Sequence, residues 1–258
     1  MTNAETLFQI DPPIAILTFN RPEARNAMTW GMYDELVAAC EQVDANANVR
    51  VFVLKGAGGK AFVSGTDISQ FRSFREPQDG IEYEKRVSNV LGRLACVTKP
   101  TIAQVEGFAT GAGCGFIATC DLSVASDDAQ IGIPIARTLG NCASSGTFAR
   151  IVNLIGPARA KEMIFTGRLI PAAEAAAIGL VNKVVPKASL ESEVMALATQ
   201  IAANAPLTIR ATKEMTRRLM DRPEQGDADL IEMCYMSADF QEGVTAFLAK
   251  RRPQWTGR

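Results

Sequence analysis

The chain has 258 residues, 47% of them hydrophobic, and its 27 lysines and arginines nearly balance 28 aspartates and glutamates. This length predicts one large domain, or a main domain with a small appendage. The net charge of -1 gives no basic excess for nucleic-acid binding. The first residues lack the layout of a signal peptide, and no apolar run approaches a membrane span in length. We therefore expect a cytoplasmic protein that binds neither nucleic acid nor membrane.

The sequence contains no histidine. Its absence excludes Ser-His-Asp and Cys-His catalysis, and it excludes metal sites with histidine ligands. The six cysteines form no CxxC pair and show no metal-ligand spacing, so we expect no metal site. Acid–base chemistry must therefore come from carboxylates, lysine, tyrosine, cysteine or bound water.

The hydrophobic pattern predicts alternating strands and helices, followed by a helical tail. Thr29 is expected to cap a helix that runs to about residue 46. Pro77 and Gly80 interrupt a polar stretch that we expect to be a mobile loop. In chain order, the other expected elements are strands at 14–19 and 49–56, a strand end that turns into a helix start at 61–69, and a helix at 81–95. They continue with strands at 100–107, 121–126 and 129–133, mostly helical structure from about 157 that is interrupted at 167–186, and amphipathic helices at 188–250.

Two glycine-rich turns, SGTD at 64–67 and GAGCG at 111–115, stand where an expected strand ends and a helix begins. Main-chain N–H groups at a helix N-terminus favour negative charge, and glycine lets a ligand oxygen approach the backbone. Two such turns that converge would supply two donors to one oxyanion. Each turn is alternatively a plain loop or a place of tight packing.

The GAGCG turn also resembles a dinucleotide-binding fingerprint, but G-x-G-x-G is not G-x-G-x-x-G. It also lies in mid-chain, after several strands, rather than in a first strand–helix unit. We therefore reject a nicotinamide-dependent dehydrogenase.

The segments AFVSGTDI (61–68) and VEGFATGAGCGFIATCDLSVAS (105–126) resemble the two signature segments of the crotonase superfamily, also called the enoyl-CoA hydratase/isomerase family. The resemblance extends to residues 14–28, 172–186 and 239–255. It implies an α/β fold: a crotonase-type spiral of repeated ββα units with a C-terminal helical oligomerisation region. Residues 1–190 would form the spiral core with the acyl-CoA site, and residues 191–258 the trimerisation region.

The resemblance further implies an acyl-CoA substrate, with coenzyme A as part of that substrate and no permanently bound cofactor or metal. The expected assembly is a homotrimer or a dimer of trimers. By position in the motif, the backbone N–H groups of Thr66 and Ala112 would form the oxyanion hole, with Gly65, Gly111 and Gly113 permitting the turn geometry.

Residues at the family's CoA-contacting positions extend beyond the turns. Arg25 matches a basic position that meets the CoA nucleotide, although a solvated loop charge is an alternative. Asp67 is better interpreted as a brace of its own turn. Phe247 and Lys250 match positions that line a neighbouring subunit's pocket, or they form a plain terminal helix face. The expected CoA-binding residues are Arg25, Ala61, Gly65, Asp67, Ile68, Gly111, Phe247 and Lys250.

The sequence departs from the family at the two glutamates that serve hydration. Gly115 stands at the first position, in GAGCG, and Ile135 at the second, in IGIPI. Neither side chain transfers a proton, so hydration of a simple enoyl-CoA is doubtful. Asn141 and Cys142 are weak substitutes, and we favour turn and capping roles for them.

Other polar side chains near these segments have structural interpretations. We expect Cys114 to be a buried inert thiol and Asp121 to be structural. Glu82 and Glu84 are expected on a solvated helix face. The function that remains is an enzyme acting through a thioester enolate, with isomerisation or decarboxylation that uses a relocated acid/base group or none. The second alternative is a non-catalytic acyl-CoA binding protein.

Overall fold

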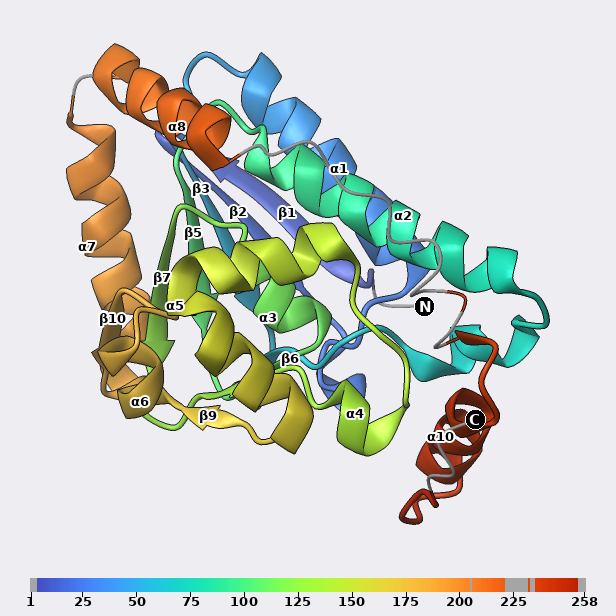
Figure 1. Ribbon diagram of the computed structural model, residues 1–258. Helices are drawn as coiled ribbons and strands as arrows, with labels where there is room; N and C mark the ends of the chain where they lie inside the picture. The colour runs from blue at the N-terminus through green and yellow to red at the C-terminus, as the bar shows by residue number, and fades with distance from the viewer. Residues whose placement is uncertain (1–3, 205, 221–231, 233–234, 255–258) are drawn as a thin grey trace.

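The computed structural model describes residues 4–204, 206–220, 232 and 235–254. A six-stranded sheet, in the order β1-β2-β3-β5-β7-β10, forms the centre of the molecule (Figure 1). β1 runs antiparallel to β2, and the other neighbours are parallel. The strands are β1 (Thr6–Asp11), β2 (Ile14–Phe19), β3 (Val51–Gly56), β5 (Thr101–Val105), β7 (Leu122–Ser126) and β10 (Lys183–Val185).

A smaller sheet has the order β4-β6-β8-β9. Its strands are β4 (Ala61–Val63), β6 (Phe108–Thr110), β8 (Gln130–Gly132) and β9 (Ile170–Pro171). The successive pairs β3–β4, β5–β6 and β7–β8 each place one strand in the large sheet and the next in the small one. Helices follow the small-sheet strands, so the chain climbs as the expected spiral of ββα units.

Helices enclose both faces of the large sheet (Figure 1). One apolar core joins the sheet to the helices α1, α2, α3 and α5, and a second core lies between the sheet and α7. The helices are α1 (Trp30–Ala45), α2 (Pro77–Ala95), α3 (Ala112–Ile117), α4 (Ile135–Thr138), α5 (Ser145–Thr166), α6 (Ala172–Ala177), α7 (Leu190–Ala202), α8 (Pro206–Met220) and α10 (Ala238–Leu248), with 3-10 turns η1 (Pro22–Ala24), η2 (Ile68–Ser73) and η3 (Lys187–Ser189).

Several boundaries differ from the expectation. The stretch 70–80 is not a loop, because η2 runs to Ser73 and α2 begins at Pro77. Proline suits the first helical position, and the Asp79 carboxylate caps this end by accepting the Glu76 N–H at 3.0 Å. The helical region expected from about 157 is preceded by a further helical stretch, because α5 begins at Ser145 with the Ser144 hydroxyl as its cap. α5 is broken at Gly156, which has φ +77, and its second part begins at Pro157.

Four short strands, β1, β6, β9 and β10, were not predicted. β1 lies before the first expected strand, and β6 lies directly before the GAGCG turn. The Thr29 cap of α1 is confirmed, since its hydroxyl accepts the Met32 N–H at 3.2 Å.

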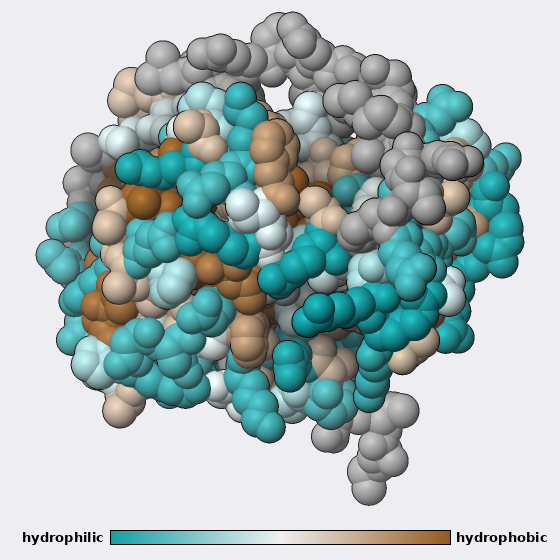
Figure 2. Space-filling model, turned by 60° about the horizontal axis from the view of Figure 1, so that its bottom comes forward, coloured by the Kyte–Doolittle hydropathy of each residue, from teal (hydrophilic) through white to brown (hydrophobic). Residues whose placement is uncertain are grey.

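The expected helices over 188–250 are observed as α7, α8 and α10, while residues 221–231 and Trp255 lie outside the described residues. Within the described part of the chain, no helix combines the length and hydrophobicity needed to cross a bilayer. Hydrophobic side chains interrupt the hydrophilic surface in patches (Figure 2). The exposed large hydrophobic residues are Leu7, Ile10, Leu154, Phe165, Met215 and Phe247. The division at residue 190 and the expected oligomer stay predictions.

Candidate active site

The first glycine-rich turn follows β4 and is held by the segment before α1. The Met28 N–H donates to the Gly65 carbonyl at 2.8 Å, and the Asp67 N–H donates to the Met28 carbonyl at 2.9 Å. These two bonds form a parallel bridge between Met28 and Thr66. In such a bridge the N–H of the central residue, Thr66, points away from the partner segment. Gly65 has φ +104, a conformation that a side chain would strain.

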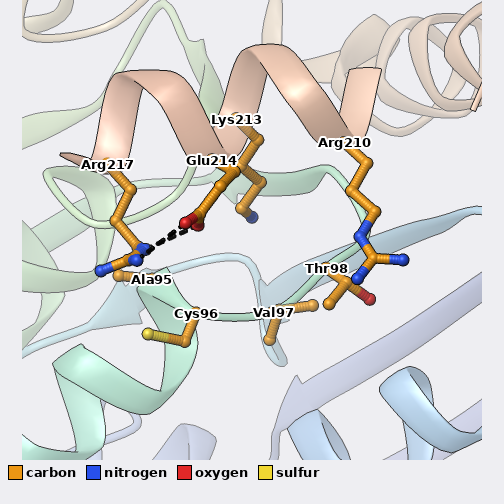
Figure 3. Close-up of a pocket in the computed structure, with 8 residues that line it drawn as sticks. All are labelled: Ala95, Cys96, Val97, Thr98, Arg210, Lys213, Glu214 and Arg217. Atoms are coloured by element: carbon orange, nitrogen blue, oxygen red, sulfur yellow. Dashed lines mark hydrogen bonds and ion pairs between the residues drawn. The ribbon is translucent and has the colours of Figure 1, made fainter. Parts of the chain in front are cut away.

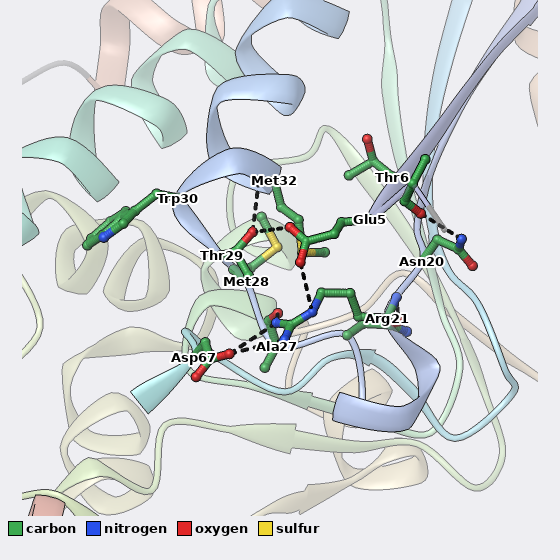
Figure 4. A network of polar contacts seen from close by, with 12 residues as sticks. Glu5, Thr6, Asn20, Arg21, Ala27, Met28, Thr29, Trp30, Met32 and Asp67 are labelled. Atoms are coloured by element: carbon green, nitrogen blue, oxygen red, sulfur yellow. Dashed lines mark hydrogen bonds and ion pairs between the residues drawn. The ribbon is translucent and has the colours of Figure 1, made fainter. Parts of the chain in front are cut away.

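Asp67 braces this turn, as the sequence predicted. Its carboxylate accepts the Ser69 N–H at 3.1 Å and the Arg21 guanidinium at 3.2 Å. Arg21 also donates to the Ala27 carbonyl at 2.7 Å and pairs with Glu5 at 3.2 Å, so its side chain lies between the two carboxylates (Figure 4). Partial burial works against ionisation, but the bonds from Ser69 and Arg21 hold the pKa of Asp67 below its usual range. Asp67 is therefore an ionised structural group.

The second turn joins β6 to α3. Gly111 has φ +55, and its N–H donates to the Gly132 carbonyl at 3.0 Å. Ala112 is the first residue of α3, where the leading N–H groups have no partner within the helix. A methyl group on Gly113 would lie 2.2 Å from the Val63 carbonyl oxygen. Glycine at this position therefore lets α3 pack directly on β4.

The two turns lie beside each other because β4 and β6 are parallel neighbours in the small sheet. Their carboxyl ends meet at one edge, and a Cβ added to Gly111 would lie 3.3 Å from the Gly65 Cα. Among the residues that the structure describes, neither the Thr66 nor the Ala112 N–H donates to a protein acceptor. The arrangement thus brings together two unpaired donors from the two predicted turns.

Gly115 and Ile135, where the family resemblance led us to expect glutamates, carry no carboxylate. Gly115 is buried, and a Cβ there would meet Leu91 at 3.6 Å and Thr147 at 3.8 Å. Ile135 is the first residue of α4 and packs partly against the main core. Cys114 is fully buried, as predicted, and burial raises the pKa of its thiol to about 12.

Asn141 and Cys142 lie on the loop before α5, against Tyr235 rather than against the turns. The Asn141 amide donates to the Tyr235 hydroxyl at 3.3 Å, and Cys142 packs into the aromatic cluster around it. The Asn141 Oδ1 atom is buried without a partner among the described residues. The cap of α5 is instead Ser144, so Asn141 does not have the capping role that we favoured.

Glu84 contradicts the expectation of a solvated helix face, whereas Glu82 is exposed as expected. Glu84 is 5% exposed, and its carboxylate accepts the Ser144 N–H at 2.9 Å and the Tyr235 hydroxyl at 2.7 Å. The signal was present in the sequence, because residue 84 lies three positions from both Ile81 and Val87 on the apolar stripe of α2. Its two partners come from remote segments that the stripe alone does not reveal.

Sequence analysis missed a chain of three hydroxyl groups at the first turn. The Thr66 hydroxyl is 2.7 Å from the Tyr33 hydroxyl and 2.8 Å from the Tyr83 hydroxyl. Tyr33 comes from α1 and Tyr83 from α2, where Tyr83 packs edge-on against Phe71. Burial holds the pKa values of both tyrosines well above their ordinary value, so both phenols keep their protons at neutral pH.

The remaining expected CoA-contacting residues surround the first turn. The exposed Arg25 guanidinium lies over the Phe108 ring at 5.3 Å, and the Arg25 carbonyl accepts the Ser64 N–H. Ala61 is buried with its carbonyl bound to Asn26, and Ile68 begins η2. On α10 and just after it, Phe247 is 50% exposed and Lys250 has φ +54. α10 packs on η2, which brings the C-terminal helix near the turn in the same chain.

Asp121 is structural, as predicted. It accepts the Thr101 N–H at 2.7 Å and pairs with Lys213 at 2.6 Å. Beside it, a cavity of about 310 Å³ lies between the end of α2 and α8 (Figure 3). No residue of either glycine-rich turn lines this cavity; its lining is Ala95, Cys96, Val97, Thr98, Arg210, Lys213, Glu214 and Arg217.

The two-sheet spiral and the paired turns define the chain as a crotonase-fold protein. A sequence profile described as enoyl-CoA hydratase/isomerase matches residues 9–258. Short-chain-enoyl-CoA hydratase of Clostridium acetobutylicum is 34% identical over 93% of this chain and 92% of its own length. The chain therefore belongs to the enoyl-CoA hydratase/isomerase family, whose members are enzymes of CoA thioesters.

Solved structures extend this similarity to other reactions. An enoyl-CoA hydratase/carnithine racemase of Magnetospirillum magneticum has 34% identity and a TM-score of 0.82, and covers 100% of this chain and 97% of its own. A methylmalonyl-CoA decarboxylase in complex with 2-nitronate-propionyl-CoA has 27% identity and a TM-score of 0.90, and covers 99% of both chains.

Proposed function

We propose that this chain decarboxylates an acyl-CoA whose α-carbon carries a carboxylate, of the methylmalonyl-CoA type. The observation that carries the proposal is the absence of a carboxylate at both hydration positions, Gly115 and Ile135. Decarboxylation needs no base to activate water, because the leaving carbon dioxide supplies the electron pair of the enolate. The high TM-score of the methylmalonyl-CoA decarboxylase structure is consistent with this reaction.

In this proposal the thioester oxygen accepts hydrogen bonds from the Thr66 and Ala112 N–H groups. The bond between the α-carbon and the carboxylate breaks, its electron pair passes into the thioester enolate, and a proton then forms the new α-C–H bond. The two amides stabilise the charge that develops on the oxygen, and each such donor is worth about a hundred- to a thousandfold in rate. The apolar contacts at Gly115 favour loss of a charged group as neutral carbon dioxide.

A second candidate is isomerisation of an enoyl-CoA by a relocated base. The buried carboxylate of Glu84 favours it, because Glu84 follows Tyr83 on α2, and the Tyr83 hydroxyl meets Thr66. Both Glu84 oxygens accept hydrogen bonds, however, and a carboxylate held in this way is a weaker base. We therefore place isomerisation second. A non-catalytic acyl-CoA binding protein is the third outcome that the experiment must separate.

The test incubates the purified protein separately with methylmalonyl-CoA, crotonyl-CoA and a 3-enoyl-CoA, and follows the products by mass spectrometry. We expect propionyl-CoA from methylmalonyl-CoA and no hydration of crotonyl-CoA. A conjugated product from the 3-enoyl-CoA would support isomerisation instead. Hydration of crotonyl-CoA at a rate normal for the family would refute the interpretation of Gly115 and Ile135, and CoA binding without any turnover would support the third outcome.

The double variant Gly115→Glu with Ile135→Glu tests the same argument in the opposite direction. If only the two carboxylates are missing, this variant gains hydration of crotonyl-CoA. General acid–base help contributes about a hundred- to ten-thousandfold per group, so a real gain is easily measured.

A further inference from the structure

The hydroxyl chain Tyr33–Thr66–Tyr83 contains more hydroxyl protons than hydrogen bonds. Its three hydroxyl groups carry three protons, and two hydrogen bonds join them. One O–H therefore has no acceptor among the residues that the structure describes. The directions of the two bonds decide whether this proton belongs to Tyr33, to Thr66 or to Tyr83, because the Thr66 oxygen can also accept from both phenols.

Burial decides the direction. Tyr33 is 0% exposed and Thr66 is 7% exposed, whereas Tyr83 is only partly buried. Leaving the proton of Tyr33 or that of Thr66 unpaired inside the protein would cost about 1–3 kcal/mol. The favoured arrangement is therefore Tyr33 donating to Thr66 and Thr66 donating to Tyr83. In this arrangement the Tyr83 phenol has an O–H free to donate to a ligand.

Covalent geometry keeps the Tyr83 O–H close to the Thr66 amide. Three covalent bonds separate the Thr66 amide nitrogen from its hydroxyl oxygen, and one hydrogen bond of 2.8 Å leads from there to Tyr83. A thioester oxygen held by the Thr66 amide would have its α-carbon two bonds away. This short path permits the phenol to lie at the rim of the space that the acyl group would occupy, as a proton donor to the α-carbon must.

We propose that Tyr83 is the catalytic acid of this site, donating its proton to the α-carbon of the thioester enolate. This inference rests on the proposed function, since it assigns a residue to the last step of that reaction. The O–H bond of Tyr83 breaks, a C–H bond forms at the α-carbon, and the electron pair stays on the phenolate oxygen. The Thr66 hydroxyl stabilises the phenolate by donating a hydrogen bond to it, while Tyr33 donates to Thr66. Water then returns a proton to the Tyr83 phenolate.

The chemistry suits a phenol that holds its proton until the enolate forms. Burial raises the pKa of Tyr83, so the group stays protonated at neutral pH, and hydrogen bonding from Thr66 partly offsets this rise. The Tyr83 phenol can therefore serve as the proton donor near the first glycine-rich turn in a chain that has no histidine. It also explains how the α-carbon receives a proton when Gly115 and Ile135 offer none.

The first test follows decarboxylation of methylmalonyl-CoA in deuterium oxide by the wild type, Tyr83→Phe and Tyr235→Phe. The Tyr235→Phe variant is the matched control, because its phenol belongs to the same aromatic cluster but donates to Glu84. We expect the wild type and Tyr235→Phe to place deuterium on one face of the α-carbon. Tyr83→Phe should give both faces, with kcat lower by about a hundredfold or more and KM nearly unchanged.

The second test needs no turnover. Tyr83→Phe should bind the nitronate form of 2-nitropropionyl-CoA about tenfold or more weakly, because the nitrogen on its α-carbon carries charged oxygens. Its affinity for propionyl-CoA should stay the same. Equal loss for both ligands, or no loss, would overturn the inference.

The outcomes separate the two proposals. A wild type that does not decarboxylate but shows the selective loss in Tyr83→Phe would refute the proposed reaction and support the Tyr83 donor. If the wild type decarboxylates methylmalonyl-CoA, the proposed reaction is supported. If Tyr83→Phe then still places deuterium on one face and keeps its nitronate affinity, the role of Tyr83 as proton donor is refuted.

Discussion

Replacing Gly113 by alanine should force the two glycine-rich turns apart. The added Cβ would lie 2.2 Å from the Val63 carbonyl oxygen and 3.1 Å from its carbonyl carbon. Both are backbone atoms of β4, so neither can rotate away and the whole of α3 must shift. Overpacking of this kind costs about 1–3 kcal/mol. For a domain of this size each kcal/mol lowers Tm by about 2–4 °C, so we expect a fall of roughly 2–12 °C.

The matched control lies two residues along the same helix. A Cβ on Gly115 would have its closest neighbours at 3.6 Å and 3.8 Å, which is ordinary van der Waals contact. Gly115→Ala should therefore keep or raise Tm, because alanine favours a helix by about 0.5–1 kcal/mol over glycine. Both glycines are buried on α3, so only the available space distinguishes the two variants.

Activity provides the second measurement on Gly113→Ala. Displacing α3 moves the Ala112 amide relative to Thr66, and a misplacement of about 1 Å can cost about a hundredfold in rate. Gly92→Ala, whose Cβ meets no heavy atom within 4 Å, should keep wild-type activity. Thermal melts test the predicted loss of stability, and turnover of methylmalonyl-CoA tests the predicted loss of rate. A Gly113→Ala protein as stable and as active as the wild type would refute the argument that close contact with Val63 sets the spacing of the turns.

Two carboxylates give further predictions. Because the folded-state pKa of Asp67 lies below its unfolded value of about 3.9, the stability it contributes is present above that value and is lost as pH falls through the folded-state pKa. Asp67→Asn should therefore lower Tm at neutral pH, and the difference from wild type should shrink as melts are repeated at increasingly acidic pH; a constant difference would contradict this. Glu84→Gln turns an NH₂ group toward the Ser144 N–H or the Tyr235 hydroxyl and should cost about 1–3 kcal/mol in denaturant unfolding, while the exposed Glu82→Gln should change stability by less than about 0.5 kcal/mol.

The sequence sufficed for the parts of the fold that depend on local chemistry. Both glycine-rich turns, the Thr29 cap and the Asp67 brace were predicted, because each depends on residues within a few positions of one another. The start of α2 was missed although it too is local. Proline was taken as a loop signal, whereas Pro77 stands at the first helical position, where its fixed φ and missing N–H are favourable.

Contacts between remote segments account for the other errors. Tyr33 and Tyr83 reach Thr66 across 33 and 17 positions, and Glu84 reaches Ser144 and Tyr235 across 60 and 151 positions. No spacing rule connects residues so far apart, since their proximity depends on how α1, α2 and the C-terminal region pack. The polar groups at this site could be recognised as a set only after the helices were placed.

The backbone and side-chain parts of this site respond differently to substitution. The Thr66 and Ala112 amides are positioned by the pairing of β4 with β6 and by the contact of Gly113 with Val63. None of these depends on which side chain stands at position 115 or 135. A family member can therefore exchange its carboxylates for glycine and isoleucine without disturbing the two donors. What such a chain then needs is a proton source that burial keeps protonated, and a phenol hydrogen-bonded to the turn itself meets that need more directly than a distant carboxylate.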